Sequence, residues 1–352
     1  MGGTIPEGIG NLAQLESLIL NSNYLKGTLP RTIGNLTQLV TLNLFGPIRT
    51  SSEDGILYAT ASLSFTGNQI TGTIPTEIGR LQSIRWLSLG FNLFTGTMPA
   101  EMGNAQNLEH LGAAGNLLTG VVPDSLAQLG KLEHLDLSLN NFNGSFPWSV
   151  SESFPVLDFL DLRRNKFVGE IETFLGEGSS YTFILLSENN FRGTIPSTFG
   201  NMTKLTGLDF GSNQLSGIIP DNIDDLPLLF LSLRDNQLEG TIPSTLGNLK
   251  QLYTLNLDTN RLNGTVPASL GNLTNLYELS IFDNDLSGVM PDSVCSLTES
   301  FTEQFFAYVA DCLPKNTSVQ VFECACCNIC CDGHLCCSDL FGGCFEASML
   351  YT

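Results

Sequence analysis

The sequence predicts an α/β solenoid of short repeats, with a parallel sheet along one side. Asparagines recur at intervals of 23 to 25 residues over most of the chain. Each follows alternating apolar positions, as Leu135 and Leu137 precede Asn140. A fixed period of this length is the signature of a solenoid, which usually presents a surface for holding something. The recurring asparagines are Asn23, Asn68, Asn92, Asn116, Asn140, Asn165, Asn189, Asn213, Asn236, Asn260 and Asn284.

One copy of the repeat shows what each position does. Leu255 and Leu257 alternate with polar neighbours, which predicts a short strand that pairs with the next coil about 4.8 Å away. Asn260 carries both a donor and an acceptor, so we expect it to satisfy backbone groups where the chain turns off the strand. Gly264 permits a backbone conformation that a side chain would obstruct, and Pro267 resists regular helix. The other side of each coil is therefore predicted to be irregular or short-helical.

The pattern LxGxIPxxLGNLxxLxxLxLxxN, from about Gly2 to Pro291, resembles the plant-type leucine-rich repeat. This repeat occurs in receptor-kinase ectodomains and polygalacturonase-inhibiting proteins. The resemblance implies an α/β leucine-rich repeat solenoid: a curved right-handed superhelix with a concave parallel sheet and an irregular or 3-10 helical convex side. We expect a solenoid of about twelve coils over 1–294 and a small cysteine-rich cap and tail over 295–352. The scaffold serves many ligands, so the resemblance names none.

The rhythm of the repeat is interrupted once over a long stretch. After Leu44 the expected asparagine is replaced by Pro47, and the pattern resumes at Asn68. Removing residues 47–67 would restore an ordinary repeat, so one interpretation is that this segment is an insertion. The alternative, which we favour from the sequence, is a degenerate coil, because Leu63 and Phe65 have the right offsets from Asn68.

A second module begins after the repeats, where all the cysteines lie. Ser296 to Glu299 has capping-box spacing, and a helical face through Leu297, Phe301, Phe305, Tyr308 and Cys312 predicts a helix that closes the end of the solenoid. Disulfides and zinc are both compatible with the Cys-x-x-Cys spacings that follow, and the even count favours disulfides. The disulfide candidates are Cys295, Cys312, Cys324, Cys326, Cys327, Cys330, Cys331, Cys336, Cys337 and Cys344.

The cysteine spacing of the tail resembles leucine-rich repeat proteins of diatoms and related microalgae, many of which are membrane-anchored. On that resemblance we expect Cys295 to pair with Cys312.

An exterior location is indicated by Asn-x-Ser/Thr sequons, although the repeat consensus itself creates several of them. The chain opens within a repeat at Met1, so we expect its true start to be missing, and any membrane link to lie in a missing segment. The expected location is extracellular or at the cell surface. The glycosylation candidates are Asn35, Asn143, Asn201, Asn263, Asn272 and Asn316.

Charge and motifs argue against several classes of function. The formal net charge of −20 disfavours nucleic acid as a partner. Asp209-Phe210-Gly211 spells the metal-binding triplet of kinases, but Phe210 is an ordinary strand position before Asn213, and no other kinase motif accompanies it. We therefore expect no enzyme activity and no cofactor.

Counting back from each asparagine gives the side chains of the concave face. Aromatic residues occupy one position on five successive coils, and acidic and basic residues follow two and four residues further on. Exposed aromatic residues beside charges are typical of recognition sites; a merely solvated face is the alternative. The candidate ligand-binding residues are Trp86, His110, His134, Asp136, Phe159, Asp161, Arg163, Phe183, Phe230 and Arg234.

These observations predict a non-enzymatic extracellular recognition module for a protein, peptide or glycan. We expect it to be receptor-like, with a role in signalling or defence, without a kinase of its own, and with a co-receptor as a further partner. The alternatives are a secreted inhibitor of a cell-wall hydrolase and an ice- or wall-binding structural protein, which would prefer a flat, regular Thr/Ser array. A metal or pH-dependent contact at His110 and His134, near Glu109 and Glu133, is a further alternative.

Overall fold

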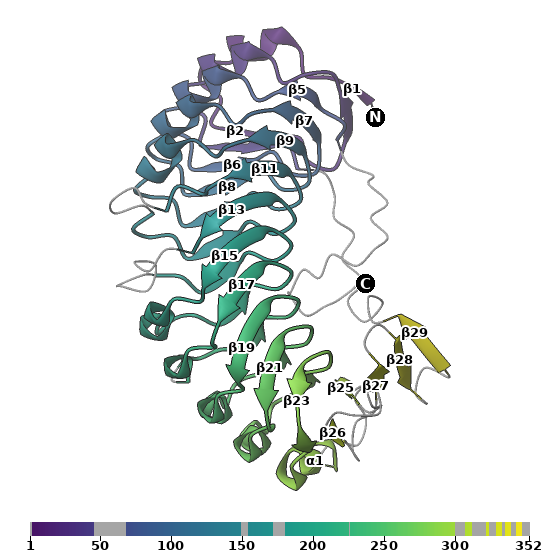
Figure 1. Cartoon of the computed structure of the whole chain (residues 1–352). Coiled ribbons are helices and arrows are strands. Elements are labelled where there is room, and N and C mark those ends of the chain that lie inside the picture. Colours follow the sequence, from purple (N-terminus) through teal and green to yellow (C-terminus); the bar gives the residue numbers. More distant parts are fainter. Residues whose placement is uncertain are drawn as a thin grey trace. The chain divides into compact units, whose positions relative to one another are not determined.

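The computed structural model describes residues 2–45, 68–148, 154–171, 180–224 and 226–299, and the backbone of the strands at 307–311, 322–323, 329–332, 335–338 and 343–346. The chain forms two compact units. The first contains residues 1–169 and 179–181, and the second contains 170–178 and 182–352. Each unit is a stack of coils, in which most coils contain a main-sheet strand, a second strand and a 3-10 helix (Figure 1).

The main sheet of the first unit is parallel and joins one strand from each coil. From β4 onward, the middle residue of every strand is a buried leucine, while the first and third residues lie on the opposite face. We call this face the open face. It includes the first and third residues of each strand and the residue two positions after the third. The strands, in spatial order, are β2 (Ser17–Ile19), β4 (Thr41–Asn43), β6 (Trp86–Ser88), β8 (His110–Gly112), β10 (His134–Asp136) and β12 (Phe159–Asp161).

The second unit has a main sheet of the same kind. Its order is β14 (Phe183–Leu185), β16 (Gly207–Asp209), β18 (Phe230–Ser232), β20 (Thr254–Asn256) and β22 (Glu278–Ser280). The sheet then continues through β25 (Ala307–Asp311), β27 (Ile329–Asp332), β28 (Leu335–Ser338) and β29 (Gly343–Glu346), where β28 pairs antiparallel with both β27 and β29. Helix α1 (Asp292–Glu299) follows the last regular coil, and β24 (Gly288–Val289) pairs with β26 (Phe322–Glu323).

Short 3-10 helices lie on the other side of the coils, as the sequence predicts. Each begins after a proline in extended conformation, such as Pro99 before η4 or Pro243 before η9. In the first unit they are η1 (Glu7–Asn11), η2 (Arg31–Asn35), η3 (Thr76–Arg80), η4 (Ala100–Asn104) and η5 (Asp124–Gln128). In the second they are η7 (Ser197–Asn201), η8 (Asp221–Ile223), η9 (Ser244–Asn248) and η10 (Ala268–Asn272).

A second set of parallel strands, which the sequence did not predict, follows the asparagines. In the first unit β1 (Gly2–Thr4) pairs with β3 (Tyr24–Lys26), and β5 (Thr71–Thr73), β7 (Leu93–Gly96), β9 (Leu117–Gly120), β11 (Asn141–Gly144) and β13 (Lys166–Glu170) follow in order (Figure 1). In the second unit the strands are β15 (Asn190–Thr194), β17 (Gln214–Gly217), β19 (Gln237–Thr241), β21 (Arg261–Gly264) and β23 (Asp285–Leu286).

The recurring asparagines form a ladder of hydrogen bonds beneath the turns. Nδ2 of Asn140, which is 7% exposed, donates to the carbonyl oxygens of Ala113, Leu137 and Ser138 at 2.9 to 3.2 Å. Its Oδ1 accepts from the backbone N–H of Leu118 at 3.0 Å. The amide thus ties its own coil to the preceding one, as the repeat pattern predicts. The same arrangement recurs at Asn92, Asn116, Asn165, Asn213, Asn236, Asn260 and Asn284.

The ladder also holds a strained turn. The residue before the asparagine has a left-handed backbone, with φ of 54° at Leu139 and 53° at Phe91. Side chains rarely adopt this conformation, which persists only where surrounding contacts enforce it. The hydrogen bonds of the ladder asparagine, on both sides of the turn, supply that constraint.

The structure places the two ends of the interruption in one coil, while the choice between an insertion and a degenerate coil over 47–67 stays a prediction. Strand β4 pairs directly with β6, from Thr41 opposite Trp86 to Asn43 opposite Ser88. Nδ2 of Asn68 donates to the carbonyl oxygen of Leu44 at 2.9 Å, the bond that other ladder asparagines make three residues back. Leu44 and Asn68 therefore belong to one coil, although 46–67 themselves lie outside the described residues.

The prediction of a helix that extends to Cys312 is wrong for the second half of that segment. Helix α1 ends at Glu299, and Ala307–Asp311 is strand β25, paired in parallel with β22. The exposed edge of β22 offers unpaired backbone groups, and pairing with it outweighs the helical pattern of the side chains. Cys295 lies in α1, whereas Cys312 lies outside the described residues. The predicted pairing of the two cysteines and the zinc alternative therefore stay predictions, as does the division at 294.

Replacing Asn140 by alanine should lower the free energy of unfolding by about 3 kcal/mol, because several buried backbone groups lose their partner. Chemical denaturation of the purified protein measures this change. Asn104→Ala is the matched control, since Asn104 is exposed on η4 and should change stability by less than about 0.5 kcal/mol. Equal effects of the two substitutions would contradict the structural role of the ladder.

Candidate functional site

Four aromatic rings form a column across the open face of the first unit. We call Trp86, His110, His134 and Phe159 the aromatic column; they are the first residues of β6, β8, β10 and β12 and lie directly opposite one another. Successive ring centroids are 4.0, 5.8 and 4.2 Å apart, and the rings of His134 and Phe159 are stacked at 6°. Trp86 is 46% exposed. Parallel strands place the rings within stacking distance because the strand spacing is close to 4.8 Å.

Charged residues lie beside the column, two and four positions further along the strands. The guanidinium of Arg163 binds the carboxylate of Asp161, with Nη2–Oδ2 at 2.6 Å and Nε–Oδ1 at 3.0 Å. The Asp161 side chain is only 4% exposed, so this pair is largely shielded from solvent. Asp136, opposite Asp161, accepts hydrogen bonds on Oδ1 from Ser138 Oγ at 2.7 Å and from Ser138 N at 3.0 Å.

Two of these groups have strongly shifted pKa values. Burial and the negative charge of Asp161 raise the pKa of the Asp136 carboxyl to about 7, against the hydrogen bonds from Ser138 and the charge of Arg163. Burial and the neighbouring His110 lower the pKa of His134 to about 4, although Asp161 opposes that shift. The column therefore contains a neutral imidazole at ordinary pH, next to a carboxyl group that titrates near neutrality.

The open face of the second unit carries the remaining predicted residues in a different arrangement. Phe183 and Phe230 flank Gly207 on neighbouring strands. The ring of Phe183 lies across Gly207, where an added Cβ would be 2.4 Å from Cδ1 of Phe183. The side chain of Arg234 likewise covers Gly211. In this unit the side chains of Phe183 and Arg234 thus fill space over glycines.

An ion pair that the sequence did not single out borders the aromatic column. Arg85, directly before Trp86, donates from Nε to Glu109 Oε1 at 2.7 Å, and this bond raises the pKa of Arg85. Glu133 occupies the same position one coil further on. In the sequence, this ion pair is indicated by the charged residues that directly precede the aromatic positions.

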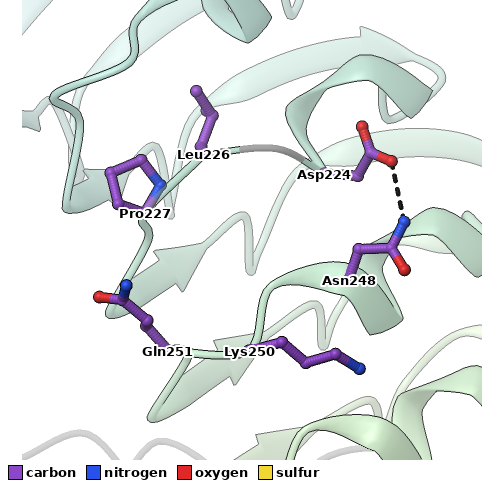
Figure 2. Close-up of a pocket in the computed structure, with 6 residues that line it drawn as sticks. All are labelled: Asp224, Leu226, Pro227, Asn248, Lys250 and Gln251. Atoms are coloured by element: carbon purple, nitrogen blue, oxygen red, sulfur yellow. Dashed lines mark hydrogen bonds between the residues drawn. The ribbon is translucent and has the colours of Figure 1, made fainter.

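The described residues contain a small pocket away from the open face. It has a volume of about 260 Å³ and lies beside η8 and η9 (Figure 2). Asp224 accepts a hydrogen bond from Asn248 at 3.0 Å, and Lys250 donates to the backbone oxygens of Gly247 and Asn272. The side chains of Asp224, Asn248 and Lys250 are thus engaged with each other or with backbone. The lining residues are Asp224, Leu226, Pro227, Asn248, Lys250 and Gln251.

The described residues hold neither of two other kinds of site. Over those ranges, no cluster of three or more His, Cys, Asp or Glu is placed to hold a metal ion, at His110 and His134 or elsewhere. No helix in the same part of the chain has the length and apolarity needed to cross a membrane.

Comparisons with known proteins agree with the repeat architecture. The family described as Leucine rich repeat matches residues 182–238, and that described as Leucine Rich Repeat matches 14–36, 61–81, 131–152 and 251–273. Among curated proteins, no sequence matches the chain. The fold and these matches define a leucine-rich repeat protein. The chain belongs to that family, and its repeats are of the plant type.

Solved structures with the same fold include plant receptors. The plant peptide hormone receptor RGFR1 in complex with RGF2 is 30% identical, with a TM-score of 0.72, over 92% of this chain and 50% of that one. The Arabidopsis receptor kinase HAESA, in complex with the peptide hormone IDA and the co-receptor SERK1, is 27% identical, with a TM-score of 0.65, over 92% and 60%. A plant ice-binding protein is 25% identical, with a TM-score of 0.59, over 76% and 79%. The chain thus spans only part of the receptor chains.

The raised pKa of Asp136 predicts a pH-dependent stability. The folded-state pKa of about 7 lies above the ordinary 3.8, so the folded protein holds a proton that the unfolded chain has released between about pH 4 and 7. Stability from this group is therefore lost as the pH rises through that range. Asp136→Asn stays neutral, and it should gain stability relative to the wild type as the pH rises from 4 to 7.

Unfolding midpoints of both proteins, measured at intervals across this range, test the assignment. His134, whose lowered pKa of about 4 gives the opposite slope, is present in both proteins, so the difference between them isolates Asp136. A difference that stays constant with pH would contradict a raised pKa.

Proposed function

We propose that the protein is a non-enzymatic, extracellular recognition module that binds a peptide or protein on its open face. The observation that carries the proposal is the aromatic column of the first unit, with the Arg163–Asp161 ion pair beside it. A few residues carry most of the binding energy of protein interfaces, and tryptophan, tyrosine and arginine are enriched among them. The similarity to receptor structures that hold peptide hormones supports a ligand of this class.

The mechanism of binding is preorganisation. Each ring of the column comes from a different coil, and the coils are tied together by backbone pairing and by the asparagine ladder. A ligand that spans several coils meets side chains already held in place, so little conformational entropy is lost on binding. A glycan could stack on the same rings, but no similarity points to that ligand class.

Receptor-like signalling and the extracellular location are part of the same proposal. HAESA is in complex with a co-receptor as well as a hormone, which supports a co-receptor as a second partner of this chain. Five of the sequon asparagines are exposed and accessible to glycosylation, and the sixth, Asn316, lies outside the described residues. The exposed ones are Asn35, Asn143, Asn201, Asn263 and Asn272.

Trp86→Ala should weaken ligand binding about ten- to hundredfold, because it removes the most exposed ring of the column. The probe is a peptide selected on the immobilised protein from a random phage-displayed library, with affinity measured by biolayer interferometry. Phe159→Ala should also weaken binding without lowering the melting temperature. The control is Val121→Ala, because Val121 is exposed directly after β9; this variant should keep the affinity. Loss of stability in parallel with affinity would argue against a surface role.

A second candidate function is ice binding, favoured by a different surface. The outward positions of β5, β7 and β9 and the residues just beyond them are all exposed and uncharged, in a chain of net charge −20. The hydroxyls of Thr71, Thr95 and Thr119 donate to backbone oxygens of the preceding coil at 3.1 to 3.3 Å, which fixes their orientation. The similarity to a plant ice-binding protein supports this candidate. The face consists of Thr71, Thr73, Leu93, Thr95, Thr97, Leu117, Thr119 and Val121.

If this threonine face binds ice, the purified protein should inhibit ice recrystallisation, and Thr95→Lys should abolish most of the effect by placing a hydrated charge in the array. Thr203→Lys, at an exposed position beyond η7, is the matched control and should retain the activity. Absence of inhibition by the wild-type protein at micromolar concentration would exclude this function.

A further inference from the structure

We propose, on the basis of the recognition function above, that the open face of the first unit takes a lysine or arginine side chain of a bound peptide. The basic group would enter a niche between β8 and β10, with Gly112 as its floor and the carboxylate of Asp136 as its wall. His110 borders the niche from the aromatic column.

The niche exists because Gly112 is left uncovered. An added Cβ at Gly112 would find nothing closer than Ser88 Oγ, at 3.9 Å. The other open-face glycines, Gly90, Gly207 and Gly211, would each place a Cβ within 3.0 Å of a neighbouring side chain. The open face therefore has unfilled space at Gly112, directly opposite Asp136 in the sheet register.

The charge of Asp136 defines what fits there. Its neighbour Asp161 forms an ion pair with Arg163, whereas Asp136 has no ion pair among the described residues. Among the hydrogen bonds of the described residues, those to Asp136 both come from Ser138 and both reach Oδ1, which leaves Oδ2 available to a donor. An ammonium or guanidinium group forms a charge-assisted hydrogen bond with such an oxygen.

The aromatic column complements the rest of a basic side chain. His110 and Gly112 lie two residues apart on the same face of β8, so the ring stands next to the niche. The aliphatic stem of lysine or arginine packs on ring surfaces while its charged end reaches a carboxylate, and the cation is attracted to an aromatic face such as Trp86. Glu133, directly before His134, adds to the negative potential, whereas Glu109 is paired with Arg85.

Binding of the basic group should depend on pH. The groups that face Asp136 are His134 on its own strand, His110 on β8, and Asp161 with Arg163 on β12. Since the pKa of Asp136 is raised to about 7, its charge is largely absent at pH 5.5 and present at pH 8. Affinity for a basic side chain should therefore increase over this range.

The experiment uses synthetic pools of dodecapeptides that are random except for one central residue, which is lysine, arginine, citrulline or norleucine. Biolayer interferometry on the full chain should show the lysine and arginine pools binding at least about tenfold more tightly than the neutral pools at pH 8. Asp136→Asn should remove this preference, and Gly112→Val should remove it by filling the niche. The preference should also shrink at pH 5.5.

Two matched controls separate these effects from general ones. Glu101→Gln makes the same charge change on η4, and Gly130→Val adds a side chain where an added Cβ has no neighbour within 4 Å. Both should keep the preference, and unfolding curves should show that all four variants are folded.

The outcomes distinguish this inference from the function on which it rests. Pools that bind equally, with binding lost in Trp86→Ala, would overturn the basic-residue niche and leave peptide recognition intact. A preference that survives both Asp136→Asn and Gly112→Val would also overturn it. Absence of binding by every pool and by every phage-selected peptide would instead count against peptide recognition itself.

Discussion

The structure depends on one constraint: the backbone turns in every coil, and its polar groups must stay hydrogen-bonded at those turns. At most described turns off the main sheet, a buried or half-buried asparagine bonds to carbonyl oxygens of its own coil and of the preceding one, as Asn140 does with Leu137 and Ala113. These bonds hold a residue such as Leu139 in a left-handed conformation that it would otherwise avoid. Coil after coil is thereby set in the same register, and every surface of the protein inherits that regularity.

Regular register has consequences that differ between positions of the open face. Stacking like residues suits aromatic rings, which gain contact at the strand spacing. It does not suit carboxylates, because Asp136 and Asp161 face each other and repel. Arg163 relieves one of them, and the other keeps its proton to near-neutral pH. Repeating one kind of side chain on neighbouring coils therefore produces either favourable stacking or repulsion between like charges. Both occur side by side on this face.

The described surface of the first unit also separates chemistry between its two sheets. The open face combines aromatic rings with charges, whereas the threonine face on β5, β7 and β9 has no charged residue. A chain with 35 acidic residues and a net charge of −20 leaves few such areas by chance. The two faces suit different ligands, one held by directed polar contacts and one by a neutral lattice of hydroxyl and methyl groups.

The sequence by itself determined the repeat, the asparagine ladder, the short main-sheet strands and the open-face positions, because these follow from periods within one coil. The tertiary structure alone decided what depends on the neighbouring coil. It made a strand of Ala307–Asp311, where a helical pattern was present, because the edge of β22 required a partner. It laid Phe183 over Gly207, left Gly112 open, and raised the pKa of Asp136. Those outcomes come from contacts between residues about one repeat apart, which no local pattern encodes.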